Sequence, residues 1–316
     1  MNYCYMVEPI SSEEKNQYLF SIYKTPLYEK KSEIHGTCIK FFTDNESFKD
    51  LWDENFKPID ENIRPHARLF AITDKTKQFR IFYEPISKTV IIKNCDYYGW
   101  VKSIALGLVA DFFEDFISEH RRYSIHGSFV DKSGRGIALI GPSGSGKTTL
   151  TYGLLLDRTN NFITDDWFFV RLTETDALVY GSEKNSYIRD DLAESWPPFK
   201  EKLKDIRKDN KGRSIVDVKR LFGESRIRSN SVLRNIVLLM RDKTQPVFQK
   251  VSAQKALSFM LDQDFCNPHQ LIRSKQKLAQ RKAFFLELFS RIPVYLLNTI
   301  ETPKESLERL KKLIKD

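Results

Sequence analysis

The sequence has 316 residues, 41% of them hydrophobic, so it can bury a large core in one or two domains without disulfide bonds. The net charge of +9 is uneven: residues 200–282 carry 21 Lys and Arg against 8 Asp and Glu, whereas residues 1–120 carry 15 against 19. Such a basic stretch fits a solvated surface, an acidic partner or a polyphosphate. Because no helix-turn-helix, zinc-finger or basic-aromatic pattern accompanies it, we do not expect nucleic acid to be the partner.

The cysteines and the N-terminal segment indicate a cytoplasmic protein. The cysteines stand far apart, with no CxxC pair and no histidine at zinc-ligand spacing, which favours reduced thiols. The first residues lack the basic and apolar regions of a signal peptide, and no apolar run approaches the roughly 18 residues that span a membrane. The four cysteines are Cys4, Cys38, Cys95 and Cys266.

Residues 1–120 are predicted to form a small α+β domain. Short β-rich runs alternate there with polar turns, at 39–42, 67–73, 79–83 and 89–93. Apolar residues four apart between Val101 and Ser118 predict an amphipathic helix. The change in charge and the start of the next motif place the domain boundary near residues 119–124.

Residues 121–316 have the pattern of an α/β nucleotide-binding domain. Strands are expected at 123–130 and 137–140, then a helix at 148–156 and a strand at 162–164. Further strands are expected at 167–172, 214–218, 236–240 and 294–298, and a closing helix at 303–315. The glycine-rich loop follows the strand at 137–140 directly.

That loop reads GPSGSGKT from Gly141 to Thr148. Glycines let backbone amides approach phosphate oxygens, and the following helix presents its positive N-terminus to them. Lys147 would reach the β and γ phosphates of ATP, and the Thr148 hydroxyl would bind Mg²⁺. The spacing predicts triphosphate binding, but it leaves open what happens to the γ-phosphate. The expected nucleotide-binding residues are Gly141, Ser143, Gly144, Ser145, Gly146, Lys147, Thr148 and Thr149.

Asp165 and Asp166 follow the next expected strand, at the sheet edge where α/β proteins bind ligands. One carboxylate can hold Mg²⁺ while the other accepts a proton from an attacking hydroxyl. His126 lies in the strand before the glycine loop, from where it could orient an aspartate. A structural histidine in a strand is the alternative.

Three blocks in this order resemble the catalytic domain of the HPr kinase/phosphorylase family. They are Ser124-Ile125-His126-Gly127 with the loop GPSGSGKTT, then Ile163-Thr164-Asp165-Asp166, then the segment from Gly212 to Gly223. The resemblance covers roughly residues 122–240. It implies an HPr-kinase-like P-loop catalytic domain, in closed oligomers, preceded by the small α+β domain.

The resemblance also implies roles for individual residues. Asp165 would be the acid/base, His126 would support it, and Thr148 and Asp166 would hold the metal. The family's glutamate and arginine before the third block fall here on Asp209 and Lys211, next to Arg213. Lysine lacks the fork of arginine, and the family's V-R-P-G-R-N loop is absent, so we expect the kinase direction alone.

The sequence thus predicts an ATP- and Mg²⁺-dependent kinase whose acceptor is a hydroxyl, most simply a serine of a protein or peptide. A kinase of a free small molecule, such as an amino acid or sugar, is one alternative. A nucleotide-binding regulator without transfer activity is another, and the paired aspartates argue against it. The sequence does not distinguish ATP from GTP or pyrophosphate as donor.

Overall fold

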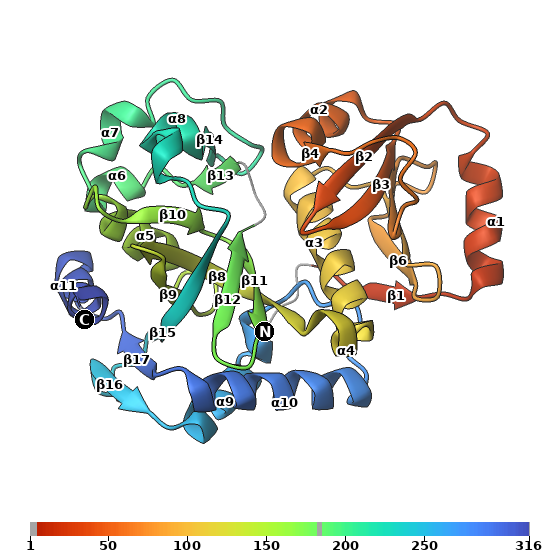
Figure 1. Cartoon of the computed structure of the whole chain (residues 1–316). Coiled ribbons are helices and arrows are strands. Elements are labelled where there is room, and N and C mark those ends of the chain that lie inside the picture. The colour runs from red at the N-terminus through yellow and green to blue at the C-terminus, as the bar shows by residue number, and fades with distance from the viewer. Residues whose placement is uncertain (1–4, 182–184, 316) are drawn as a thin grey trace. The chain divides into compact units, whose positions relative to one another are not determined.

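The computed structural model describes residues 5–181 and 185–315, and these fall into two compact units (Figure 1). Unit 1 contains the described residues of Met1–Ile117 together with the segment Pro268–Ser274. Unit 2 contains those of Ser118–Asn267 and Lys275–Asp316. Cys4 lies outside the described residues; within them, Cys38 and Cys266 are buried and form no disulfide. No described helix is both long and apolar enough to cross a membrane.

Unit 1 is built on a mixed sheet with the strand order β1-β6-β7-β5-β3-β2-β4 among the described residues. The β5 strand pairs in parallel with both β3 and β7, while β2–β3 and β6–β7 are antiparallel hairpins. The strands are β1 (Val7–Pro9), β2 (Tyr28–Ile34), β3 (Thr37–Thr43), β4 (Lys57–Pro58), β5 (Ala67–Ile72), β6 (Arg80–Glu84) and β7 (Thr89–Lys93).

Helices flank this sheet because its central strands are apolar on both faces. Helix α1 (Ser12–Ile22) begins with a capping box from Ser11 and covers a cluster that includes Phe42, Phe70 and Phe82. Helix α3 (Tyr98–Asp115) is almost wholly buried and packs against β5 and α2 (Glu46–Asn55). A short helix, α4 (Ile117–His120), follows α3.

The segment Pro268–Ser274 returns to unit 1 and lies against α3. Gly107 allows this approach, since a Cβ there would stand 2.8 Å from the carbonyl oxygen of His269. The Tyr5 hydroxyl and His269 Nδ1 are 2.6 Å apart. The sequence gives no signal for this return.

Unit 2 is an α/β domain around a mixed sheet. Strands β8, β11, β12, β15 and β9 pair in a closed circuit, and β15 also continues through β17 to β16. The strands of the sheet are β8 (Arg122–Lys132), β9 (Arg135–Ile140), β10 (Asn161–Thr164), β11 (Trp167–Leu172), β12 (Ala177–Gly181), β15 (Asn230–Met240), β16 (Phe248–Val251) and β17 (Val294–Asn298).

The strand directions gather the carboxyl ends of several strands at one edge. Strands β9, β15 and β17 are mutually parallel. Strand β8 runs antiparallel to both β9 and β10, so the last residue of β10 ends on the same side as Ile140. The middle of β8 lies at this edge. Gly127 pairs with Ile140, the last residue of β9, and His126 pairs with Trp167, the first residue of β11.

A core of buried side chains fixes the helix that follows β9. Helix α5 (Lys147–Leu155) packs on α11 (Pro303–Lys315), and its Leu154 and Tyr152 join a cluster with Trp196 and Phe199. The hairpin β13 (Asn185–Ile188) and β14 (Ser214–Asp217) adds Ile188 and Val216 to the same cluster. The other helices of the unit are α6 (Leu192–Ser195), α7 (Phe199–Lys202), α8 (Val218–Phe222), η1 (Glu224–Arg226), α9 (Ala253–Asp262), η2 (Asp264–Cys266) and α10 (Lys275–Arg291).

The fold class expected from the sequence, an α/β domain preceded by an α+β domain, is confirmed. The strand, glycine loop and helix around residues 137–156 stand where the pattern predicts them.

Candidate functional site

The glycine-rich loop connects β9 to α5. Gly144 has φ +78° and Gly146 has φ +97°, a left-handed backbone that favours glycine. Gly141 has a different requirement, because a Cβ there would lie 2.6 Å from Ser145 Oγ and 2.7 Å from the carbonyl oxygen of Leu239. The structure therefore explains why glycine is needed at three positions of the motif.

The loop presents hydrogen-bond donors at the start of α5. Gly146 is the N-cap and makes no side-chain cap, so the amides of the first turn are available to an anion. Lys147 Nζ donates to the carbonyl oxygens of Gly141, at 2.7 Å, and Pro142, at 3.2 Å. Burial lowers the pKa of Lys147, while the charge of Asp166 opposes that shift.

The other predicted loop residues differ in exposure. Ser143 is exposed, whereas Thr148 and Thr149 are partly buried in the first turn of α5. Ser145 is 3% exposed, and its Oγ has no hydrogen-bond partner within residues 5–181 and 185–315. A buried hydroxyl without a partner is unfavourable, and a ligand oxygen would satisfy it.

Thr299 supports the loop from the neighbouring strands. Its Oγ1 donates to the carbonyl oxygen of Ser145, at 2.9 Å, and accepts from Arg241 Nε, at 3.3 Å. Thr299 follows β17 and Arg241 follows β15, at the edge where β9 also ends. Thr299 was not predicted from the sequence, although a polar residue at the carboxyl end of an expected strand is a usable signal.

His126 lies against Asp166. His126 Nε2 is 3.2 Å from Asp166 Oδ1, and His126 Nδ1 donates to the carbonyl oxygen of Cys266 at 2.6 Å. The resemblance implies instead that His126 supports Asp165. The contact with Asp166 arises because residues 165 and 166 form a bend between β10 and β11, and the pairing of His126 with Trp167 brings the adjacent Asp166 next to the ring.

The carbonyl that holds His126 belongs to a left-handed turn. Asp264, Phe265 and Cys266 have φ values of +47°, +55° and +54°. Each such residue costs roughly 1–2 kcal/mol outside glycine, so packing must hold the turn. Phe265 is 4% exposed and stacks on Phe285, with ring centroids 5.3 Å apart. No local pattern in the sequence indicates this partner of His126.

Asp165 is held by hydroxyl groups. It is 7% exposed and accepts hydrogen bonds from Tyr152 at 3.2 Å and from Ser186 at 3.1 Å. Burial and the nearby Asp165 charge raise the pKa of Tyr152 well above its usual value, so this hydroxyl remains a donor. Neither hydroxyl was predicted from the sequence, because a core helix and a distant hairpin supply them.

Asp209, Lys211 and Arg213 form a turn before β14. Asp209 Oδ1 accepts from the backbone amides of Lys211 and Arg213, each at 2.9 Å, and Asp209 Oδ2 accepts from Arg213 Nε at 2.9 Å. Burial lowers the pKa of Arg213 to about 10, and its guanidinium lies 5.1 Å from the ring centre of Tyr187. Tyr187 neighbours Ser186, which links this turn to Asp165.

The described part of the chain holds no group of three His, Cys, Asp or Glu side chains that could bind a metal by themselves. Mg²⁺ keeps several waters and needs only one or two carboxylates besides phosphate. Thr148 and the aspartate pair are the residues that fit this requirement.

Comparisons with known proteins place this part of the chain in a family. The family described as HPr Serine kinase C-terminal domain matches residues 119–279. The HPr kinase/phosphorylase of Chlorobium limicola is 29% identical over 46% of this chain and 38% of its own length. That of Bordetella petrii is 26% identical over 59% of this chain and 53% of its own.

The chain therefore spans about half or less of these relatives' length. A solved structure of the Hpr(Ser) kinase/phosphatase from Coxiella burnetii has a TM-score of 0.34 and 16% identity, covering 60% of this chain and 96% of that one. The family match alone spans half of the sequence and contains the glycine loop, His126 and both aspartates. The chain belongs to the HPr serine kinase C-terminal domain family.

Proposed function

We propose that the protein is an ATP- and Mg²⁺-dependent kinase that transfers the γ-phosphoryl group to a serine hydroxyl of a protein or peptide. The observation that carries the proposal is the contact of His126 with Asp166 at the sheet edge where β9 leads into the glycine loop and Lys147. The charge of Asp166 acts on Lys147, and His126 contacts Asp166 at 3.2 Å. Phosphoryl transfer to a hydroxyl uses a phosphate-binding lysine and a carboxylate that accepts the hydroxyl proton, and a histidine can orient that carboxylate.

The loop from Gly141 to Thr148 fits the phosphates of ATP. Support comes from its left-handed glycines, the uncapped start of α5 and the buried Ser145 hydroxyl. Thr148 and one aspartate would hold Mg²⁺, which neutralises charge on the phosphate oxygens. We assign this aspartate as Asp165, because carboxylates that bind metals are commonly fixed by hydrogen bonds such as those from Tyr152 and Ser186.

Asp166 would then accept the proton of the attacking hydroxyl. It is more exposed than Asp165, with 36% of its side chain accessible, so an acceptor can reach it. His126 holds the carboxylate in place, and the carbonyl of Cys266 holds His126. This division exchanges the roles that the resemblance implies for the two aspartates, and it rests on the contacts of His126.

We also propose that the protein catalyses the kinase reaction but not the reverse, phosphorylase reaction. Asp209 is engaged in its own turn and in the ion pair with Arg213, at 2.8 Å. It is shorter than the glutamate of the family pattern, and Lys211 cannot form the forked contacts of arginine.

The names of the relatives, HPr kinase/phosphorylase, support a protein as acceptor.

Incubation with isotope-labelled ATP, Mg²⁺ and a fractionated cell extract tests the proposal. We expect label on a protein serine with the parent chain, and none with Lys147→Met. Lys304→Met, an exposed lysine on α11, is the matched control and should label the acceptor normally. If the label appeared on a free metabolite, the acceptor would be a small molecule and not a protein. Undiminished labelling by Lys147→Met, or ATP binding without any phosphoryl transfer, would refute the proposed kinase activity.

A further inference from the structure

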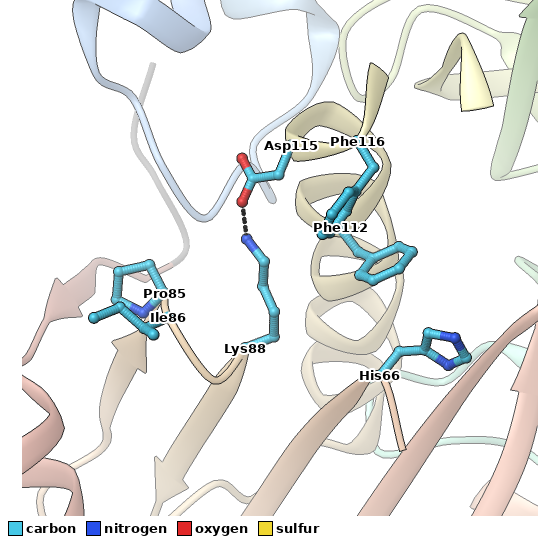
Figure 2. A pocket seen from close by; sticks show the side chains of 7 residues that line it. All are labelled: His66, Pro85, Ile86, Lys88, Phe112, Asp115 and Phe116. Carbon is cyan, nitrogen blue, oxygen red and sulfur yellow. Dashed lines mark hydrogen bonds and ion pairs between the residues drawn. The ribbon is translucent and has the colours of Figure 1, made fainter. Parts of the chain in front are cut away.

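Unit 1 contains a cavity of about 440 Å³ that the proposed kinase function does not use. It lies between the last turns of α3, the β6–β7 turn and the residue before β5 (Figure 2). Its size falls within the range of small-molecule sites. The lining residues are His66, Pro85, Ile86, Lys88, Phe112, Asp115 and Phe116.

The cavity lining holds one ammonium, Lys88, and one carboxylate, Asp115, and Lys88 also pairs with Asp111, which is not part of the lining. Lys88 Nζ donates to Asp111 Oδ2, at 2.5 Å, and also pairs with Asp115 (Figure 2 shows the second contact). One ammonium thus faces two carboxylates. Lys88 and Asp111 are buried, with 8% and 3% of their side chains exposed, whereas Asp115 is 40% exposed. The acidic group is therefore the one that a ligand meets.

The histidine of the cavity adds no positive charge. His66 Nδ1 accepts a hydrogen bond from the backbone amide of Cys38, at 2.9 Å. A ring nitrogen that accepts a hydrogen bond carries no proton, so the imidazole is neutral in this geometry. The Tyr83 hydroxyl donates to Asp111 at 2.5 Å, and burial raises the pKa of Tyr83, so it too stays uncharged.

The remaining walls are aromatic and apolar. Phe112 and Phe116, one helical turn apart, have ring centroids 4.9 Å apart, and Phe112 meets His66 edge-on at 5.1 Å. Phe116 is 42% exposed and Ile86 is 86% exposed, so apolar surface is presented to solvent beside Asp115. Aromatic faces attract cations, and the attraction strengthens when the cation is desolvated.

We propose that this cavity binds a small organic cation, an ammonium group carried on an aromatic or apolar body. The ammonium lies beside Asp115 and the ring of Phe116, and the body contacts Phe112, Pro85 and Ile86. Carboxylate ligands are disfavoured, because Lys88 is already shared by two carboxylates. The inference is independent of the proposed kinase function.

Calorimetric titration of the full chain with three matched probes tests this site. The probes are benzylammonium, benzyl alcohol and benzoate, which differ in charge and share the ring. We expect benzylammonium to bind about ten-fold more tightly than benzyl alcohol, and benzoate to bind more weakly than either. Tighter binding of benzoate would overturn the proposal, and so would the absence of saturable benzylammonium binding.

Three variants locate the binding. Asp115→Asn and Phe116→Ala alter exposed side chains and should each weaken benzylammonium binding about five-fold or more. Asp53→Asn, a 46% exposed carboxylate on α2 paired with Lys30, is the control and should bind like the parent. Circular dichroism confirms folding of each variant. Equal benzylammonium affinity in a folded Asp115→Asn variant and in the control would refute the assignment.

Discussion

His126 Nε2 lies 3.2 Å from Asp166 Oδ1, while His126 Nδ1 contacts a backbone carbonyl. A carbonyl only accepts hydrogen bonds, so Nδ1 carries a proton. The other ring nitrogen lies against the carboxylate, so the imidazole bridges a backbone carbonyl and Asp166. Asp165 accepts hydrogen bonds from the hydroxyl groups of Tyr152 and Ser186.

Substitution of each aspartate by asparagine should separate their roles. Asp166→Asn removes the proton acceptor and should lower kcat by about 10²–10⁴-fold, with ATP affinity retained. Asp165→Asn should raise the Mg²⁺ concentration that gives half-maximal rate by about ten-fold or more. Steady-state kinetics at varied Mg²⁺ measures both effects. The reverse pattern would restore the roles that the resemblance implies.

Thr299→Val should weaken nucleotide binding by loosening the glycine loop. The valine cannot donate to the Ser145 carbonyl or accept from Arg241, each lost hydrogen bond being worth about 1 kcal/mol. Thr302→Val is the matched control, because it removes only the capping box of α11. Calorimetry with ATP should detect a loss for Thr299→Val alone; equal affinity in both variants would deny Thr299 this role.

Gly141→Ala should destabilise the loop by overpacking. The new Cβ would stand 2.6 Å from Ser145 Oγ and 2.7 Å from a carbonyl oxygen, and a clash of this kind costs about 1–3 kcal/mol. Gly36→Ala is the comparison: its φ of +82° makes alanine unfavourable, but no atom lies within 4 Å of the added Cβ. Urea unfolding and ATP titration should show impaired ATP binding only in Gly141→Ala. Normal binding by that variant would mean that the loop adapts.

Stability should fall at alkaline pH through Cys266. Burial raises the pKa of this thiol from its usual value of 9.0 to about 12. Between these values the unfolded chain ionises while the folded chain does not, so the contribution is complete below pH 9 and decreases as pH rises. The slope is at most about 1.4 kcal/mol per pH unit. Unfolding free energies between pH 9 and 10.5 should decrease more steeply in the parent than in Cys266→Ala; parallel curves would contradict the assignment.

The parts of the fold that local sequence determines could be predicted. The strand, loop and helix around Gly141 follow from a short apolar run, glycines and a helical pattern within a few turns of chain. Helices α1 and α10 were not predicted. For α1 a local signal was present, because Ser11 and Glu14 form a capping box at its start.

The candidate site was predictable in its residues but not in its contacts. Lys147, His126 and the aspartates are found by spacing, whereas the partner of His126 depends on the register of β8 against β11. Ser186, Tyr152 and Cys266 come from distant segments that tertiary packing brings together. A single sequence does not encode such pairings in any local pattern.

The left-handed turn at Asp264–Cys266 also has a covalent consequence. Cys266, Asn267 and Pro268 are consecutive, and Pro268 begins the segment that belongs to unit 1. The backbone oxygen that orients His126 thus belongs to a tightly packed turn that leads directly into one of the three points where the chain passes between its two units. Only one residue, Asn267, separates Cys266 from the segment of unit 1.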